Sequence, residues 1–179
     1  MLTESDQRLL LSLARQAIAS AVNNQPKIDL HDFPAALQEQ LGAFVTLYED
    51  DDLRGCIGYL TAVLPLAETV SDAAVKAALC DPRFMPVNPS ELGNLKIEIS
   101  ILSPLKTISN VEEIQVGRDG ILIEAPGKKG VLLPKVAVEY GWDRDRFLRE
   151  TSIKAGGPAD LWKKPDSKIY TFTADVFCE

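Results

Sequence analysis

The sequence contains few of the residues that build metal centres and disulfide frameworks. It has one histidine, His31, and three cysteines, Cys56, Cys80 and Cys178. A single imidazole and the absence of any Cys-x-x-Cys spacing exclude the common zinc-binding patterns. An odd number of widely separated cysteines also argues against a disulfide framework. The sequence therefore predicts neither a metal site nor a disulfide-stabilised fold.

Long hydrophobic runs and secretory signals are absent as well. No apolar run approaches the roughly 18 residues that a membrane-spanning helix requires. Residues 1–6 are acidic and polar, without the basic region that opens a signal peptide. We therefore expect a cytoplasmic protein with no membrane contact. The sequence also lacks the Gly-x-Ser-x-Gly element of hydrolases and the glycine fingerprint of dinucleotide-binding proteins.

Positive charge is scarce in the first third of the chain. Residues 1–52 hold nine acidic and three basic side chains, whereas residues 53–179 hold 17 acidic and 16 basic ones. The whole chain has a net charge of −7. Non-specific nucleic-acid binding depends on phosphate neutralisation, so this balance argues against it. A local site for a small anion in the second part remains open.

The hydrophobic periodicity predicts an α+β fold. At 179 residues the chain has room for one domain, or for a larger lobe and a smaller one. Helical spacing of apolar residues is found over residues 4–23, 34–41, 65–80, 134–140 and 144–155. Strand-like runs cover residues 43–48, 53–60, 95–101, 113–116, 121–125, 131–133 and 168–177. Most connections are short, which favours a mixed, mostly antiparallel sheet flanked by helices.

The most informative stretch is the second strand of a predicted hairpin, residues 53–60. Two glycines interrupt it, and glycines inside a strand mark a bulge or a place where a backbone or ligand comes close. Side chains alternate along a strand. Simple alternation places Arg54, Cys56 and Gly58 on one face, and Leu53, Gly55, Ile57 and Tyr59 on the other.

Two interpretations of Cys56 follow from this pattern. A guanidinium close to a thiol favours the reactive thiolate, so Arg54 would activate Cys56. A thiol packed among apolar side chains is inert, and free cysteines are among the most buried residues. His31 is either a base for Cys56 or a surface loop residue. The sequence leaves these alternatives open.

Other polar residues are candidates for the same site. Arg83 follows a proline after the second long helix, and it pairs with a carboxylate or binds an anion. Glu98 lies on the polar face of strand 95–101, as a general base, an arginine partner or a solvated side chain. Lys128 and Lys129 lie in a glycine-bounded turn that resembles a weak phosphate cradle or is simply solvated. A P-loop is excluded because its glycine-lysine order is missing.

Leu53-Arg54-Gly55-Cys56-Ile57-Gly58 resembles the signature of the AMMECR domain family, also called AmmeMemoRadiSam system protein A. Further segments match in family order over nearly the whole chain: 42–47, 81–84, 130–134, 139–143, 155–156 and 168–170. The resemblance implies a single domain, residues 1–179, with a larger and a smaller lobe. It places the Arg-Gly-Cys strand near the cleft between them. Genes of this family lie beside, or are fused to, genes for a Memo-type protein and a radical SAM protein, which are the partners it implies.

Two hypotheses for function follow, and neither specifies a cofactor. In the first, the chain is a cytoplasmic ligand-binding or adaptor component of an AmmeMemoRadiSam system. Gly55, Gly58, Arg83 and Glu98 would then contact a small anionic ligand or a partner. In the second, the chain is an enzyme in which Cys56 is an activated thiol assisted by Arg54.

Overall fold

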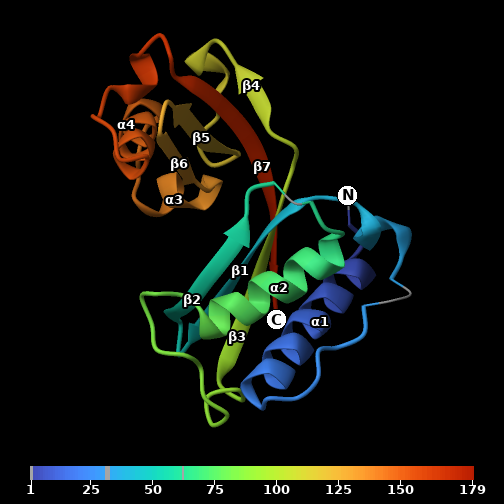
Figure 1. Cartoon of the computed structure of the whole chain (residues 1–179). Coiled ribbons are helices and arrows are strands. Elements are labelled where there is room, and N and C mark those ends of the chain that lie inside the picture. The colour runs from blue at the N-terminus through green and yellow to red at the C-terminus, as the bar shows by residue number, and fades with distance from the viewer. Residues whose placement is uncertain (1, 31–32, 62) are drawn as a thin grey trace. The chain divides into compact units, whose positions relative to one another are not determined.

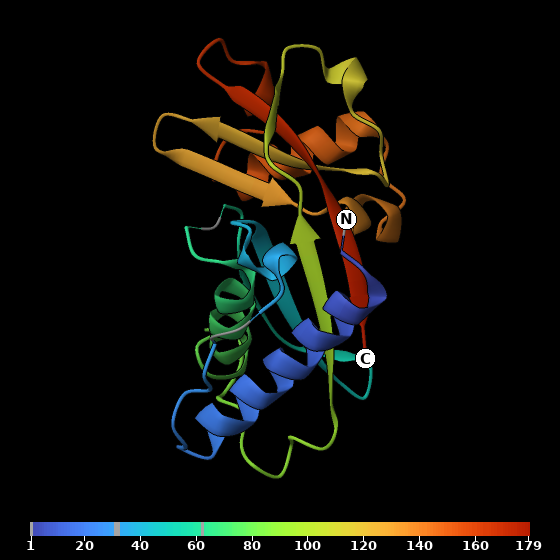
Figure 2. The same ribbon diagram turned by 90° about the vertical axis from the view of Figure 1, so that its right-hand side faces the viewer.

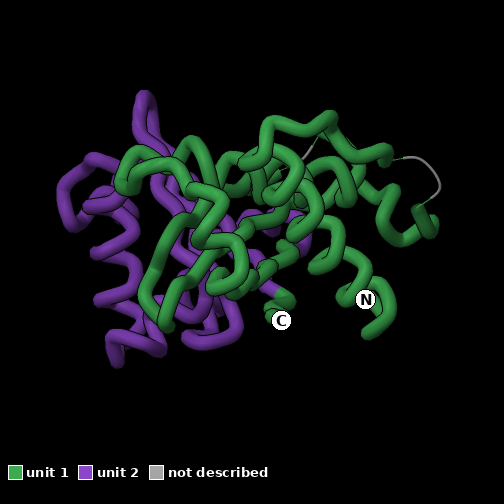
Figure 3. The backbone as a smooth tube through the Cα atoms, turned by 90° about the horizontal axis from the view of Figure 1, so that it is seen from below, with its two compact units in different colours: residues 1–102, 175–179 green, residues 103–174 purple. Residues whose placement is uncertain are grey.

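The computed structural model describes residues 2–30, 33–61 and 63–179. The chain forms two compact units, which Figure 3 distinguishes by colour. Unit 1 comprises Met1–Leu102 and Asp175–Glu179, and unit 2 comprises Ser103–Ala174. Unit 2 is therefore an insertion in unit 1, since the chain leaves unit 1 after Leu102 and returns to it at Asp175. The single domain with two lobes around a cleft, which the family resemblance implies, remains a prediction.

Unit 1 consists of antiparallel strands in the order β2-β1-β3, packed against two helices (Figure 1). Helix α2 packs on β1 and β2, and α1 packs on α2 and β3. Figure 2 shows α1 along most of its length. The elements are α1 (Glu4–Val22), a 3₁₀ turn (Ala35–Gln38), β1 (Gly42–Glu49), β2 (Asp52–Tyr59), α2 (Leu66–Leu79) and β3 (Leu95–Leu102).

The core of unit 1 follows from alternation in the strands and helical spacing in the helices. Val45, Leu47 and Ile99 are fully buried on the sheet face that α1 and α2 cover. Burying one such side chain contributes about 1.5–3 kcal/mol. Helix α2 presents several alanines to the sheet, so its backbone approaches the strands closely. The start of α1 is fixed by a capping box between Thr3 and Asp6.

Unit 2 contains strands in the order β4-β7-β5-β6, and every pairing described among them is antiparallel. Helix α4 packs on β5 and β6, and α3 packs on β5. Phe147 and Leu148 of α4 are fully buried in this core. The elements are β4 (Lys106–Ile108), β5 (Asp119–Ala125), β6 (Lys128–Leu132), α3 (Pro134–Glu139), α4 (Arg144–Lys154) and β7 (Lys168–Cys178), with 3₁₀ turns at Val111–Glu113 and Leu161–Lys163.

Strand β7 contributes to both units. Its first part pairs with β4 and β5 in unit 2, and its last residues belong to unit 1. The backbone N–H of Glu179 donates to the carbonyl of Ile97 at 3.1 Å, and its carboxylate accepts from the N–H of Ile97 at 3.1 Å. Arg15 of α1 donates to the same carboxylate at 2.7 Å. The end of β7 is thus fixed to β3 and α1.

The α+β fold predicted from the sequence is confirmed, although each strand pair with a described register is antiparallel rather than mixed. The strand predicted at 113–116 is wrong. A 3₁₀ turn forms at Val111–Glu113 because Asn110 accepts a hydrogen bond from the N–H of Glu112 at 2.9 Å. The short strand β4 was missed. Within the described ranges, no helix is long and apolar enough to cross a membrane.

The two lysines expected at a hairpin tip lie in strand β6 instead. The amine of Lys128 donates to the carbonyl of Gly156 at 2.5 Å, and the amine of Lys129 lies 3.9 Å from the carboxylate of Glu124. The turn between β5 and β6 is therefore only two residues long, at 126–127. Both lysines contact protein groups from a strand, so the glycine-bounded loop expected around them does not form.

Candidate functional site

The hairpin that carries Cys56 has a two-residue turn followed by a bulge. Asp50 and Asp51 have φ angles of +51° and +65°, as a primed hairpin turn requires. Beyond the turn, Tyr48 pairs with Leu53 and Leu47 pairs with Gly55. Arg54 is thus an extra residue without a partner on β1, which defines a β-bulge.

The bulge corrects the prediction that Arg54 and Cys56 act together on one strand face. An extra residue re-aims its own side chain and reverses the alternation before it, so Leu53 lies on the face of Tyr48 rather than opposite it. The Nε of Arg54 donates to Glu91 at 2.7 Å, and its Nη1 donates to the carbonyl of Met85 at 2.9 Å. Both charged side chains are mostly buried, at 15% and 16% exposure. Arg54 therefore fixes the loop after α2.

Glu91 completes this ion pair from the loop side. Its second carboxylate oxygen accepts from the backbone and side-chain nitrogens of Asn88, at 2.8 and 2.6 Å. The hydrogen bond from Arg54 is the main reason that the pKa of Glu91 lies below its usual range. The pair Arg54–Glu91 is therefore a structural clamp between β2 and the loop.

Cys56 lies in a row of polar side chains across three strands. Thr46 of β1 pairs with Cys56 of β2 on one side and with Glu98 of β3 on the other. Directly paired residues project to the same face of the sheet. The hydroxyl of Thr46 donates to the Sγ of Cys56 at 3.3 Å. Thr46 is buried, and Cys56 is half-buried.

Asp81, at the end of α2, connects the Cys56 backbone to Arg83. Its carboxylate accepts the N–H of Cys56 at 2.9 Å and binds Arg83 through two hydrogen bonds, at 2.9 and 2.7 Å. The Nη2 of Arg83 also donates to the carbonyl of Cys56 at 3.4 Å. The Asp81 side chain is 2% exposed, whereas that of Arg83 is 53% exposed. This ion pair therefore covers the outer edge of β2 at Cys56.

Asp81 and Arg83 each shift the pKa of the other toward its charged form. The hydrogen bonds from Arg83 hold the pKa of Asp81 well below its usual range, and the backbone N–H of Cys56 adds to this effect. The hydrogen bonds to Asp81 in turn raise the pKa of Arg83. Asp81 therefore stays ionised at all ordinary pH values, and the Arg83 guanidinium donates to the carbonyl of Cys56.

The glycines of β2 serve close packing. A Cβ at Gly55 would lie 2.2 Å from the carbonyl oxygen of Ala77 in α2. A Cβ at Gly58 would lie 2.4 Å from the carbonyl oxygen of Ala43 and from the ring of Phe44. The expectation that another backbone approaches these glycines is thus confirmed. Gly55 faces α2 and is buried, so the structure gives it no open space for a ligand.

The structure brings together Cys56, Arg83 and the strand position of Glu98, and it holds the Arg54 guanidinium in an ion pair with Glu91. His31 lies outside the described residues. In the described part of the chain no cluster of histidine, cysteine or acidic side chains could hold a metal ion. The predicted ligand-binding roles of Gly58, Arg83 and Glu98 remain predictions.

Sequence reasoning missed Thr46, Asp81 and Glu91. Thr46 could have been found by counting back along the hairpin from the turn at Asp50 and Asp51, because the register then places it near Cys56. Asp81 stands before proline at the end of a helix, a position that suits a carboxylate acting on backbone N–H groups. Glu91 had no local signal, since the bulge that brings Arg54 to it cannot be seen in the pattern.

Comparisons with known proteins agree with this architecture. A family model described as AMMECR1 matches residues 11–177. Protein TK0174 of Thermococcus kodakarensis is 45% identical over 95% of this chain and 88% of its own length. Protein MK0488 of Methanopyrus kandleri is 44% identical over 99% of this chain and 90% of its own. The crystal structure of the uncharacterised protein PH0010 from Pyrococcus horikoshii superposes with a TM-score of 0.90 at 43% identity, covering 96% of this chain and 90% of that one.

Proposed function

Because the chain belongs to the AMMECR1 family, we propose that it is a cytoplasmic ligand-binding or adaptor component that acts with a Memo-type protein and a radical SAM protein. The partners follow from the gene association that the family resemblance implies. One observation favours binding over catalysis: both arginines near Cys56 are held in ion pairs, Arg54 with Glu91 and Arg83 with Asp81. A rigid network of this kind suits recognition of a partner or ligand.

In this proposal, the half-exposed guanidinium of Arg83 contacts the partner or ligand. Its orientation is fixed by two hydrogen bonds to Asp81, so little side-chain entropy is lost when an anionic group binds. Asp81 neutralises part of its charge, which favours a weakly acidic partner surface or a small singly charged ligand. Glu98 pairs with Thr46, as Cys56 does, and would border that site.

The test is co-purification with the Memo-type and radical SAM proteins of the same genome. Recovery of either protein with this chain supports the proposal, and Arg83→Gln is expected to weaken the recovered complex. Arg8→Gln is a matched control, because Arg8 is also exposed and pairs with Glu4 on the surface of α1. If neither protein is recovered with the wild-type chain, the adaptor proposal is wrong.

A second candidate function is thiol chemistry at Cys56. The Thr46 hydroxyl donates to its sulfur, and a donor of this kind stabilises a thiolate. The test uses a Cys80→Ser/Cys178→Ser double variant, because both of those thiols are exposed and would also be labelled. Faster alkylation of Cys56 by iodoacetamide in the folded than in the unfolded chain, slowed by Thr46→Val, supports an enzyme. Equal or slower alkylation in the folded chain rejects it.

A further inference from the structure

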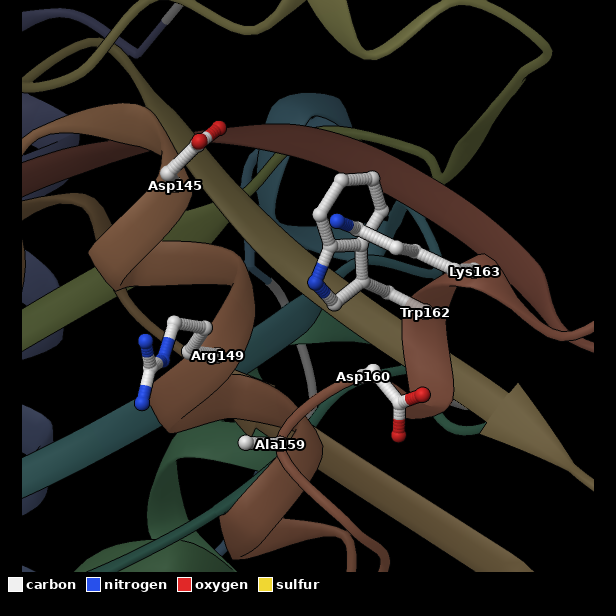
Figure 4. Close-up of a pocket in the computed structure, with 6 residues that line it drawn as sticks. All are labelled: Asp145, Arg149, Ala159, Asp160, Trp162 and Lys163. Atoms are coloured by element: carbon white, nitrogen blue, oxygen red, sulfur yellow. The ribbon is translucent and has the colours of Figure 1, made fainter.

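Unit 2 contains a pocket of about 400 Å³ between α4 and the segment that follows it. A volume of this size is within the range of small-molecule sites. Figure 4 shows Asp145 and Arg149 on successive turns of α4, with Trp162 facing the helix from the other side. The lining residues are Asp145, Arg149, Ala159, Asp160, Trp162 and Lys163.

The fold holds Trp162 firmly in this wall. Helix α4 ends before Gly156, which has a φ of +76° and turns the chain back. The backbone N–H of Trp162 donates to the hydroxyl of Ser152 in α4 at 3.3 Å, and that hydroxyl donates to the carbonyl of Leu148 at 2.9 Å. Leu161 beside it is buried in the core of unit 2. The pocket is therefore a preformed part of the fold.

The indole nitrogen of Trp162 lacks a hydrogen-bond acceptor. Among the described residues, it is the one side-chain nitrogen or oxygen that is buried with no partner. Buried donors of this kind are rare, because leaving one unsatisfied is costly. In Figure 4 this nitrogen is on the edge of the ring turned toward α4. The amine of Lys163 lies 4.8 Å from the ring centroid.

Two oppositely charged side chains at the pocket, Asp145 and Arg149, also form no ion pair with any described residue. Asp145 and Arg149 are four residues apart on α4, yet neither has an ion-pair or hydrogen-bond partner in the described part of the chain. Arg146 and Glu150, at the same spacing on the same helix, do pair, at 2.7 Å. Asp160 is paired as well, with Lys164 at 3.0 Å. Among the described residues, the pocket lining thus offers the unpaired Arg149 guanidinium, the unpaired Asp145 carboxylate and the indole N–H donor, while the Lys163 amine lies beside the Trp162 ring.

We propose that this pocket binds a small zwitterion of the amino-acid class. Its carboxylate binds Arg149 and the indole N–H of Trp162, because a guanidinium receives a carboxylate through two parallel hydrogen bonds. Its ammonium group binds Asp145. The backbone positions of Asp145 and Arg149 are separated by about 6 Å of helix rise, so the two side chains can reach the two ends of one α-amino acid.

The mixed charges of the lining, two acidic and two basic side chains, disfavour the simpler ligand classes. A phosphate dianion would meet the carboxylates of Asp145 and Asp160, and a simple amine would leave Arg149 and the indole N–H without an acceptor. The exposed side chains of Arg149 and Lys163 must shift for a carboxylate to reach the indole nitrogen. Ligand binding should therefore change the environment of Trp162 directly.

The test is an NMR titration of the full chain that follows the indole N–H resonances. The probes are L-alanine, acetate, methylamine and inorganic phosphate. We expect L-alanine to shift the Trp162 resonance saturably while the Trp142 resonance stays in place, and acetate to bind more weakly. Methylamine and phosphate should produce no saturable shift. The absence of a saturable shift with L-alanine overturns the proposal, as does tighter binding of phosphate.

Variants on α4 provide the second readout. Arg149→Gln and Asp145→Asn should each weaken L-alanine binding by about tenfold or more, because each removes a charge-assisted hydrogen bond. Arg146→Gln is the matched control, since it removes the same charge from the same helix outside the pocket. Equal weakening by Arg146→Gln overturns the proposal. Trp162→Phe keeps a ring but loses the N–H donor, so unchanged affinity in a folded Trp162→Phe protein also overturns it.

Discussion

Two aspartate–arginine pairs that are close in sequence behave in opposite ways in the two units. In unit 1, Asp81 and Arg83 bind each other through two hydrogen bonds, and the aspartate is almost completely buried. In unit 2, Asp145 and Arg149 lie on one helix at a spacing that permits a pair, yet both are exposed and unpaired within the described residues. The first pair satisfies buried backbone groups, whereas the second borders a pocket.

The comparison shows that burial, rather than spacing, decides which charges become structural. Asp81 accepts the N–H of Cys56 at an edge strand, so its removal would leave a donor and a cation without their partner. Exposed pairs at helical spacing contribute little, because water solvates each charge well. Charges that the fold does not use remain available for a ligand.

The largest effect is expected for Asp81→Ala. This change leaves the Cys56 N–H and the Arg83 guanidinium without their acceptor, and we expect a loss of about 2–4 kcal/mol in the free energy of unfolding. Urea denaturation followed by circular dichroism measures it. Asp52→Asn, at an exposed position of the same hairpin, is the control and should change stability by less than about 0.5 kcal/mol. Equal losses in both variants would contradict the structural role of Asp81.

The next effect is expected for Gly55→Ala. The new methyl group would lie 2.2 Å from the carbonyl oxygen of Ala77, so α2 must move away from β2. Because Asp81 follows α2 directly, the movement also strains its bond to Cys56. We expect a loss of about 1–3 kcal/mol, measured by thermal or urea denaturation. Gly93→Ala, where a Cβ meets nothing within 4 Å, should be neutral, and a comparable loss there would refute the packing explanation.

Lowering the pH is expected to have a smaller effect on the free energy of unfolding. The pKa of Asp81 is lowered in the folded chain by Arg83, while in the unfolded chain it is about 3.9. As the pH falls, the carboxyl group of Asp81 is therefore protonated in the unfolded state before it is protonated in the folded state. The stabilisation by Asp81 is complete above about pH 4 and declines as the pH falls further. Asp81→Asn should show a flatter decline between about pH 4 and pH 2. Parallel pH profiles for both proteins would contradict this assignment.

The smallest effect on stability is expected for Arg149→Gln. Because Arg149 is exposed and has no partner in the described part of the fold, its loss should change the free energy of unfolding by less than about 0.5 kcal/mol. The same substitution is expected to remove most binding of L-alanine. A variant that is clearly destabilised would mean that Arg149 belongs with Asp81 and Arg83 as a structural charge.

The sequence carried enough information for the secondary structure of unit 1 and for most of unit 2. Strand β3 alternates clearly, and α2 has a continuous apolar stripe, so local periodicity alone predicts both. The strand expected at 113–116 failed because the Asn110 side chain bonds to the backbone and stabilises a turn. Such competition between a side chain and strand pairing leaves no periodic signal.

The sequence also predicts part of the candidate site. The position of Cys56 and the close approach at the glycines of β2 follow from alternation and from the absence of side chains. The direction of Arg54 does not, because one bulged residue reverses the alternation that precedes it. The pairing of Asp81 with Cys56 joins residues that are 25 positions apart, so it depends on how α2 packs against β2.

The insertion of unit 2 into unit 1 has a consequence for synthesis on the ribosome. All residues of unit 2 emerge before the last five residues of unit 1, Asp175–Glu179. Arg15 and Ile97 must therefore wait for Glu179 until all of unit 2 has been synthesised. The nascent chain can complete unit 2 first, while the edge of β3 at Ile97 stays open until Glu179 has emerged.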